Sequence, residues 1–387
     1  MRQVLFEIPL PFGDKSLPIF GFGLMLATGF VIAVWICVQR ARKEGIHPDT
    51  IWDIALYCLI GGIIGARVFF FIFEEPPQGN LWEKFLAFFE IWKGGLVFYG
   101  SIVGGFLAYL IAYYRFLKKA GISTLKIADI AAPSIALAIF FGRIGCFLNG
   151  CCWGQAADPV LVPQWQTVQF PANSSPHHSA VELGWQSAYG FVLADAELGL
   201  QHGGKDRRVV TFVEPGSPAE AAGLKVGDPI VEVGGVETKD VDFIIGKLVM
   251  PYLHLELARQ PAGQPLHLTV ERGGRTQEIQ YTPPPSVPLH PAQLYSSLDG
   301  LLMFLFLSAF YPLRRRYGEV TVLLMIFYAI NRISIEQLRN DTPAAFLFHM
   351  TLSQTISLFM LLAAAGLYVY IRKTQPLLSE NAPVAKP

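Results

Sequence analysis

The chain has 387 residues, of which 52% are hydrophobic and only 16% are charged, and its mean hydropathy is +0.40. These values are typical of a polytopic membrane protein. The 30 basic and 30 acidic side chains cancel, which excludes a bulk electrostatic attraction to nucleic acid. Residues 1–12 lack the basic and apolar regions of a cleavable signal peptide, so the first apolar run is expected to act as the targeting signal.

Seven apolar runs have the roughly 20 residues that a helix needs to cross a bilayer. They are 17–38, 51–73, 96–116, 127–148, 293–311, 320–338 and 352–371. The sixth run is the least apolar because it carries Asn331, Arg332 and Glu336, but its first half is strongly apolar. Three glycines between residues 61 and 65 predict that another helix approaches the second run closely. We therefore predict an all-α polytopic membrane protein with seven transmembrane helices.

Basic residues follow every odd-numbered run, whereas the other loops have few of them near the membrane. The clusters are Arg40, Arg42 and Lys43; Arg115, Lys118, Lys119 and Lys126; Arg314, Arg315 and Arg316; and Arg372 and Lys373. Because basic loops stay in the cytoplasm, we expect the N-terminus outside and the C-terminus in the cytoplasm. Residues 81–92 are too short to span, and they are predicted as an interfacial helix on the outer surface or a loop helix packed on the bundle.

The composition divides the chain into four parts. A first membrane block, 1–160, holds four runs, and a second, 288–376, holds three, with a cytoplasmic tail at 377–387. Between the blocks, residues 161–287 are richer in glycine, proline and charge, and no run there could span a bilayer. By the orientation above, this insert lies outside the membrane.

The insert has the sequence signals of a small β-rich α+β domain. Short strands are predicted at 209–213, 229–233 and 266–270. Ser217 is expected to cap a helix that begins at Pro218 and ends at Gly223. The stretch 209–240, VVTFVEPGSPAEAAGLKVGDPIVEVGGVETKD, resembles PDZ domains of the bacterial protease-associated type, and the resemblance covers about 198–282.

In PDZ domains a loop similar to Leu-Gly-Leu receives a peptide C-terminus by strand addition. The resemblance assigns that place to Leu198, Gly199 and Leu200. The alternative is a degenerate module that only packs on the membrane helices.

Cysteines occur in two settings. Cys37 and Cys58 lie inside apolar runs and are interpreted as apolar filling. Cys146, Cys151 and Cys152 cluster after the fourth run. They are interpreted as small packing residues, as a disulfide pair, or as metal ligands together with His177 or His178. Because no paired CxxC is present, no metal site is predicted.

Charged side chains near the outer ends of the runs are the best indication of function. They are Arg67, Arg143, Arg332, Arg339, Glu336 and His290. An arginine in hydrocarbon costs several kcal/mol unless it has an anion or a wet cavity, and its planar fork suits a phosphate diester. The set therefore indicates a phospholipid headgroup site, with internal salt bridges and snorkelling anchors as the alternative.

Several motifs together resemble the prolipoprotein diacylglyceryl transferase family. They are Gly23-Leu24-Met25, Trp92-Lys93-Gly94-Gly95-Leu96, GRIGCFLNGCCWG at 142–154, His290-Pro291-Ala292-Gln293-Leu294-Tyr295, and Tyr328 to Arg339. The resemblance implies an enzyme of the bacterial inner membrane that transfers diacylglycerol from phosphatidylglycerol to the lipobox cysteine of a prolipoprotein signal peptide. It implies no cofactor, metal or nucleotide.

The resemblance also assigns site residues. Arg143 and Arg332 match the essential arginines of the family, and Tyr328, Asn149, Gly154, Glu336 and Arg339 match other functional or signature positions. His290 and Tyr99 are the candidate bases, and Arg67 is a candidate lipid-binding residue. Three positions depart from the family pattern: Tyr99 replaces a histidine, Phe22 a tyrosine, and Cys146 an asparagine.

These departures leave alternatives open. The chain is interpreted as a divergent active enzyme, as an enzyme with another acceptor thiol, or as a non-catalytic homologue that acts as a peptide-binding receptor or chaperone through its insert.

Overall fold

The computed structural model describes residues 4–9, 16–73, 80–89, 95, 97–158, 160–172, 174–193, 208–238, 242–245, 248–251, 264–339 and 350–378. They belong to two units, one comprising Met1–Phe22, Ile144–Tyr295 and Gln337–Pro343, and the other Gly23–Arg143, Ser296–Glu336 and Ala344–Pro387. The predicted peptide-binding loop, Leu198 to Leu200, lies outside the described residues.

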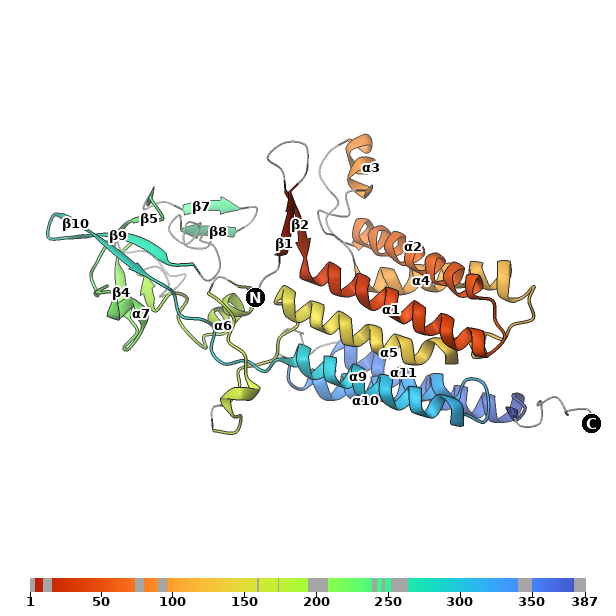
Figure 1. Cartoon of the computed structure of the whole chain (residues 1–387). Helices are drawn as coiled ribbons and strands as arrows, with labels where there is room; N and C mark the ends of the chain where they lie inside the picture. Colours follow the sequence, from red (N-terminus) through yellow and green to blue (C-terminus); the bar gives the residue numbers. More distant parts are fainter. Residues whose placement is uncertain are drawn as a thin grey trace, which may run out of the picture. The chain divides into compact units, whose positions relative to one another are not determined.

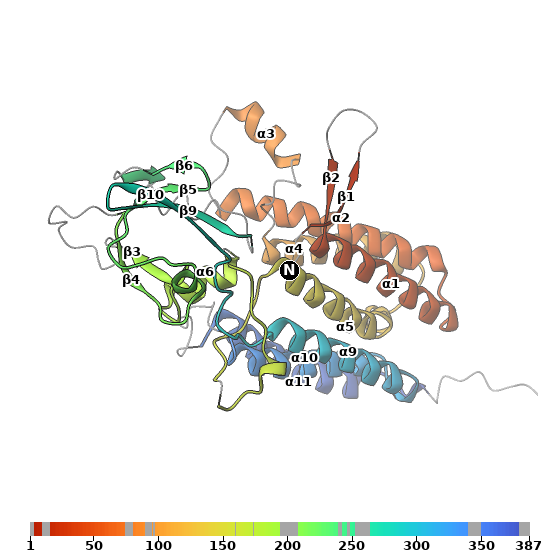
Figure 2. The ribbon, with the colours of Figure 1, turned by 60° about the vertical axis from the view of Figure 1, so that its left-hand side comes forward.

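Helices form nearly all of the second unit (Figures 1 and 2). They are α1 (Gly21–Lys43), α2 (Pro48–Phe73), α3 (Leu81–Phe89), α4 (Phe98–Ala112) with a π-helical continuation (Tyr113–Leu117), α5 (Thr124–Asn149), α9 (Ala292–Phe310) with a 3-10 turn (Tyr311–Leu313), α10 (Glu319–Glu336) and α11 (Leu352–Thr374). The ends of α1, α5 and α9 that adjoin the unit boundaries belong to the first unit.

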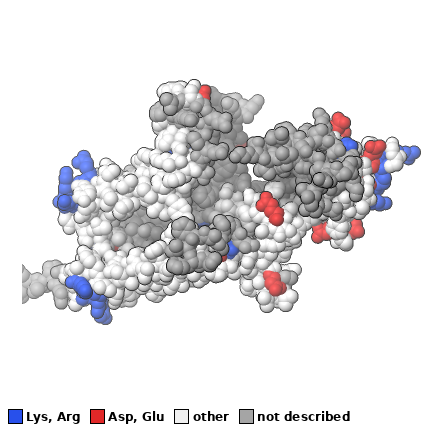
Figure 3. Space-filling model, turned by 180° about the vertical axis from the view of Figure 1, so that it is seen from behind, with Lys and Arg blue, Asp and Glu red and all other residues white. Residues whose placement is uncertain are grey.

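Among the described residues, six helices are long and apolar enough to cross a membrane, in place of the seven that the sequence predicts. The remaining predicted span is formed as α10, but its 18 residues include Glu319, Arg332 and Glu336. Lys and Arg side chains gather at one end of the helices, whose flank carries little charge (Figure 3). The last turns of α1 and α11 supply basic residues, as predicted.

The start of the first predicted span is wrong. Residues 17–20 belong to a hairpin of β1 (Val4–Pro9) and β2 (Ser16–Phe20), and α1 begins only at Gly21. Pro18 explains the difference, because its ring disfavours the helical conformation for the residue before it and it has no N–H to donate.

The close helix approach predicted at the glycines of the second run is confirmed, and its partner is α4. A Cβ atom built on Gly65 would lie 2.3 Å from the carbonyl oxygen of Gly100, and one on Gly104 would lie 2.2 Å from that of Gly61. The backbones of α2 and α4 therefore touch where side chains would otherwise separate them.

A buried carboxylate fixes the start of α10. Asp129 on α5 is fully buried and accepts hydrogen bonds from the backbone N–H of Gly318 (2.7 Å) and from the N–H (2.9 Å) and hydroxyl (2.8 Å) of Thr321. Nearby, Arg314 pairs with Glu44. Although burial raises the pKa of Glu44, the hydrogen bond and charge of Arg314 hold it below its ordinary value. The Asp129 carboxylate lies at the N-terminus of α10. A carboxylate in this position stabilises a helix, because the helix dipole favours negative charge there.

Strands are the commonest regular elements that the structure describes in the insert. They are β3 (Phe191–Leu193), β4 (Val210–Val213), β5 (Ile230–Val233), β6 (Val236–Glu237), β7 (Asp242–Ile245), β8 (Leu248–Pro251), β9 (Leu266–Arg272) and β10 (Arg275–Tyr281). The order β10-β9-β5-β6 makes a four-stranded antiparallel sheet, while β3–β4 and β7–β8 are separate pairs. A 3-10 turn (Gln164–Gln166) and the helices α6 (Ser175–Glu182) and α7 (Pro218–Ala221) complete the described elements of the insert.

The three predicted strands and the predicted helix cap of the insert are confirmed. Ser217 accepts a hydrogen bond from the N–H of Glu220 (3.2 Å), and the Glu220 carboxylate accepts one from the N–H of Gly216 (2.6 Å). Buried apolar side chains from β3, β4, β5, β9 and β10 make one core with α7. The insert therefore has a hydrophobic core of its own.

Candidate active site

Two of the predicted arginines line one cavity. Arg143 projects from α5, and Tyr328 and Arg332 project from α10. The rest of the lining comes from Ile139, Ser296, Met303, Asn331 and Ile335. The cavity measures about 20 Å³, which is room for about one water molecule. The structure thus brings together the two arginines that the sequence singles out.

Arg332 is held in place from two helices. Its Nη2 lies 3.0 Å from the carboxylate of Glu336, one turn along α10, and donates to the Ser353 hydroxyl on α11 at 2.6 Å. Glu336 has no exposed side-chain surface and accepts a hydrogen bond from the Thr351 hydroxyl at 2.8 Å. The guanidinium is therefore oriented by an anion that is itself fixed by the start of α11.

Arg67 binds backbone oxygens. Its side chain is buried and donates to the carbonyls of Phe88 (3.0 Å), Ala87 (2.5 Å) and Gly95 (2.9 Å). Arg67 lies on α2, and its guanidinium has enough N–H donors to bind all three carbonyls. These hydrogen bonds link α2 to the end of α3 and to the loop around Gly95. This geometry favours a positioning role for Arg67 over direct binding of a phosphate.

Arg339 does not share a helix face with Arg332. The i, i+7 spacing of the two residues predicts one shared helix face, but α10 ends at Glu336. The chain then pairs with the segment after α5, since the N–H of Gln155 donates to the carbonyl of Leu338 at 2.8 Å. Arg339 is half-buried in this irregular segment.

Gly154 and His290 meet in the first unit. The N–H of Gly154 donates to the carbonyl of His290 at 2.9 Å. A Cβ atom on Gly154 would lie 2.7 Å from that oxygen and 2.9 Å from the carbonyl oxygen of Leu338. Gly154 is thus required for the close approach of three backbone segments.

The ring of His290 has a tyrosine beside it. Its Nδ1 lies 3.4 Å from the hydroxyl of Tyr295, which donates to the carbonyl of Gln166 at 3.1 Å. Burial lowers the pKa of His290, which favours the neutral imidazole. A cavity of about 380 Å³ adjoins Tyr295 and is lined also by Trp165, Gln166, Thr167, Val168, Pro291 and Leu294.

The remaining predicted residues lie at helix ends. Asn149 is the last residue of α5 and is half-buried. Tyr99 lies in the first turn of α4, with 41% of its surface exposed. Sequence reasoning missed Ser353 and Thr351, because their link to Arg332 and Glu336 depends on how α11 packs against α10.

Apolar helices of membrane-crossing length around a pair of arginines define a multi-pass membrane protein with a cationic internal site. The chain belongs to the prolipoprotein diacylglyceryl transferase family, whose sequence model matches residues 9–370.

Three relatives illustrate the similarity, and each is named phosphatidylglycerol–prolipoprotein diacylglyceryl transferase. The protein of Rhodopirellula baltica is 29% identical over 381 residues, covering 91% of this chain and 72% of that protein. That of Clostridium tetani is 36% identical over 198 residues, covering 50% and 72%. That of Staphylococcus aureus strain Newman is 32% identical over 162 residues, covering 42% and 56%.

Proposed function

We propose that this chain transfers diacylglycerol from phosphatidylglycerol to the lipobox cysteine thiol in the signal peptide of a prolipoprotein, the first step of lipoprotein maturation. Family membership and the names of the relatives support the reaction. The observation in this molecule that carries the proposal is the cavity where Arg143, Tyr328 and Arg332 meet. Two guanidinium groups beside one space suit a phosphate.

The proposed chemistry requires an anion to leave. The thiol loses its proton, because the thiolate is the nucleophile. Its sulfur forms a bond to the diacylglycerol carbon that bears the phosphate, and the bond from that carbon to the phosphate oxygen breaks. The phosphate departs with the electron pair and with the headgroup glycerol, as glycerol-1-phosphate. Arg143 and Arg332 would stabilise the charge that develops on this phosphate in a site of low dielectric constant.

His290 and Tyr99 are the proposed acceptors of the thiol proton. The lowered pKa of His290 supports its candidacy, because a base must be unprotonated before it acts. Tyr99 stands where the family pattern has a histidine and is exposed, but its phenol must give up its own proton before it can accept one from the thiol. Direct stabilisation of the thiolate by the arginines is the alternative to a base.

The cavity between Arg143 and Arg332 is smaller than the lipid headgroup that it is proposed to bind. A space of about 20 Å³ does not hold a phosphoglycerol headgroup. We therefore propose that side chains around Arg143 and Arg332 move apart when the lipid binds.

The reaction is testable by complementation of a bacterium depleted of its own transferase. We expect growth, and a gel shift of a model prolipoprotein that requires its lipobox cysteine. A well-expressed protein that gives neither, and that transfers no lipid to a lipobox peptide in detergent with phosphatidylglycerol, would favour the non-catalytic receptor.

We propose further that the N-terminus and the insert lie outside an inner membrane and the C-terminus in the cytoplasm, on the strength of the basic residues after α1 and α11. Val226 and Arg315 are both exposed, so each can be replaced by cysteine. A membrane-impermeant thiol reagent should label Val226→Cys in intact cells above the background of the parent protein, but not Arg315→Cys. The opposite labelling would reverse the orientation.

The insert is proposed to be a PDZ-like module that recruits precursor peptides, with Leu198, Gly199 and Leu200 as its binding loop. Its own hydrophobic core supports its treatment as a separate module. Replacing residues 189–282, which hold all of that core, with a flexible linker should preserve transfer to a short lipobox peptide and weaken transfer to full-length precursors. Loss of both activities in a stable protein would show that the insert completes the active site.

Replacing Glu336 with glutamine is expected to lower the transfer rate roughly 10- to 100-fold without reducing the amount of folded protein. Glutamine can still accept from Thr351 but lacks the charge that orients Arg332, and a hydrogen bond to a charged group contributes about 1.5–3 kcal/mol. The measurement is the initial rate with phosphatidylglycerol and a lipobox peptide. Glu319→Gln, in the first turn of the same helix, is the control and should retain the normal rate. Equal rates for the two variants would contradict the positioning role.

A further inference from the structure

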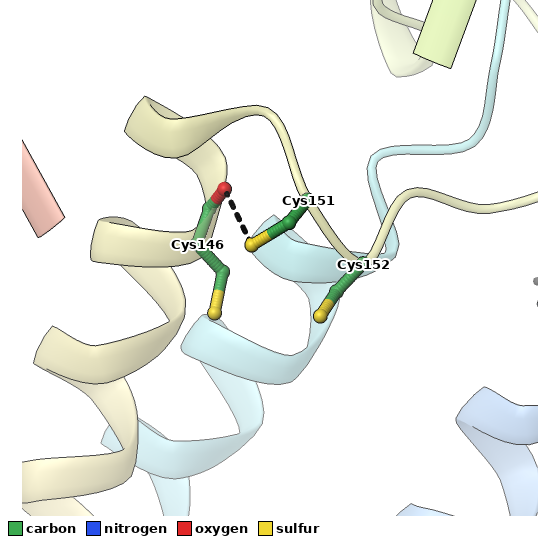
Figure 4. A group of neighbouring side chains, drawn as sticks. All are labelled: Cys146, Cys151 and Cys152. Carbon is green, nitrogen blue, oxygen red and sulfur yellow. Dashed lines mark hydrogen bonds between the residues drawn. The ribbon is translucent and has the colours of Figure 1, made fainter. Parts of the chain in front are cut away.

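Three cysteine thiols meet where α5 ends. The sulfur atoms of Cys146, Cys151 and Cys152 all lie within 4.8 Å of one another, and all three residues are half-buried thiols that form no disulfide. Figure 4 shows Cys146 on the last turns of α5 and the other two on the chain that follows, with the three sulfurs facing a common space. The Cys151 thiol also donates to the carbonyl of Cys146 at 3.6 Å.

The backbone is bent to make this arrangement. Among the residues that the structure describes, Cys152 is the one non-glycine with a positive φ, at 62°, and it follows Gly150 at 72°. A left-handed conformation costs a non-glycine residue about 1 kcal/mol or more. Gln293, on α9, donates to the carbonyl of Cys151 at 2.8 Å and holds the turn. Strain of this kind persists where a defined side-chain placement is required.

The spacing of the sulfurs fits a thiolate metal site. Zinc binds cysteine sulfur at about 2.3 Å, so two sulfurs on one ion are about 3.8 Å apart in a tetrahedron and at most about 4.6 Å apart. Shifts of about 1 Å or less would bring the three sulfurs to these distances. A disulfide would use only two of the three thiols and leave the third without a role.

We propose that Cys146, Cys151 and Cys152 bind one thiophilic d10 metal ion of the zinc type as three thiolates. Binding releases the three thiol protons, so that a divalent ion and three thiolates carry a net charge of −1. In the described part of the chain neither His177 nor His178 joins the three sulfurs, and the fourth position is left to water or another small ligand. The ion would cross-link the end of α5 to the chain segment that leads to Gly154. α5 is the helix that carries Arg143.

Cobalt(II) titration of the purified full-length protein tests the proposal. The protein is reduced, freed of metal in detergent, and titrated with cobalt(II) under anaerobic conditions. We expect thiolate-to-cobalt charge-transfer bands that saturate at one equivalent and disappear when zinc(II) is added. This measurement needs no variant, and its failure would overturn the proposal whether or not the chain is a transferase.

Cys152→Gly is the most informative variant, because glycine adopts positive φ without strain while the third sulfur is lost. It should fold at least as well as the parent and bind cobalt(II) roughly tenfold or more weakly. Cys58→Ala removes a thiol from α2 and should leave the titration unchanged. Bands that persist in Cys152→Gly, or a disulfide among the three cysteines of the non-reduced protein together with no cobalt binding after reduction, would refute a three-thiolate site.

Discussion

Arg332→Lys is expected to lose about 99% or more of the transfer activity while the protein remains folded. A planar fork can contact a phosphate through two nitrogens and an ammonium cannot, and removing one such contact in a transition state costs roughly 100-fold or more. Lysine would also alter the contacts with Glu336 and Ser353 that orient Arg332. The same loss is expected for Arg143→Lys, because both arginines line one cavity.

The measurement is the initial rate of diacylglycerol transfer to a lipobox peptide, at saturating and at limiting phosphatidylglycerol. Arg40→Lys is a matched control, since Arg40 also lies on a membrane helix and donates to Ser308 at 2.7 Å, but in the basic last turn of α1. The Arg40→Lys variant should retain most of the transfer activity. Near-normal rates for both Arg143→Lys and Arg332→Lys would show that these arginines only stabilise the helices.

Gly65→Ala is expected to destabilise the helical unit by about 1–3 kcal/mol and to reduce the yield of folded protein. The added methyl group would lie 2.3 Å from the carbonyl oxygen of Gly100 and 2.7 Å from the Cα atom of Gly104. Both obstacles are backbone atoms, so no side chain can rotate away, and α2 and α4 would have to separate. Thermal unfolding in detergent and the recovery of monodisperse protein measure the effect.

The neighbouring glycine provides the control. A methyl group on Gly62 would meet its nearest neighbour, the carbonyl oxygen of Ser101, at 3.5 Å, which is ordinary contact. Gly62→Ala should therefore be as stable as the parent. If the two alanine variants unfold at the same temperature, the close packing of α2 on α4 does not limit stability.

Local sequence signals predicted the elements that depend on residues near one another in the chain. Long apolar runs gave the helices, the spacing of Gly61 and Gly65 gave the close approach, and Ser217 followed by Pro218 gave the start of α7. The hairpin before α1 does not follow from hydropathy, because the residues around Pro18 are as apolar as those of the helix. At this position the turn signal of the proline outweighs hydropathy.

Other features could not be predicted, because their partners are distant in sequence. Asp129 reads as a lone acid in an apolar run, and the groups that satisfy it lie 189 and 192 residues away. Arg67 has the same charge as Arg332, yet the carbonyls that it binds belong to a loop and a short helix. Convergence of Arg143 and Arg332 was predictable because membrane topology limits where polar side chains can meet.

The hydroxyl of Thr351 makes two hydrogen bonds at once. It accepts from the N–H of Gln354 (3.2 Å) as the cap of α11, and it donates to Glu336 (2.8 Å). One hydroxyl can serve both partners at once, because it is donor and acceptor together. We therefore expect position 351 to keep a short side chain that both donates and accepts for as long as position 336 is acidic. The two positions should be inherited as a pair, so that a substitution at either creates selection for a change at the other.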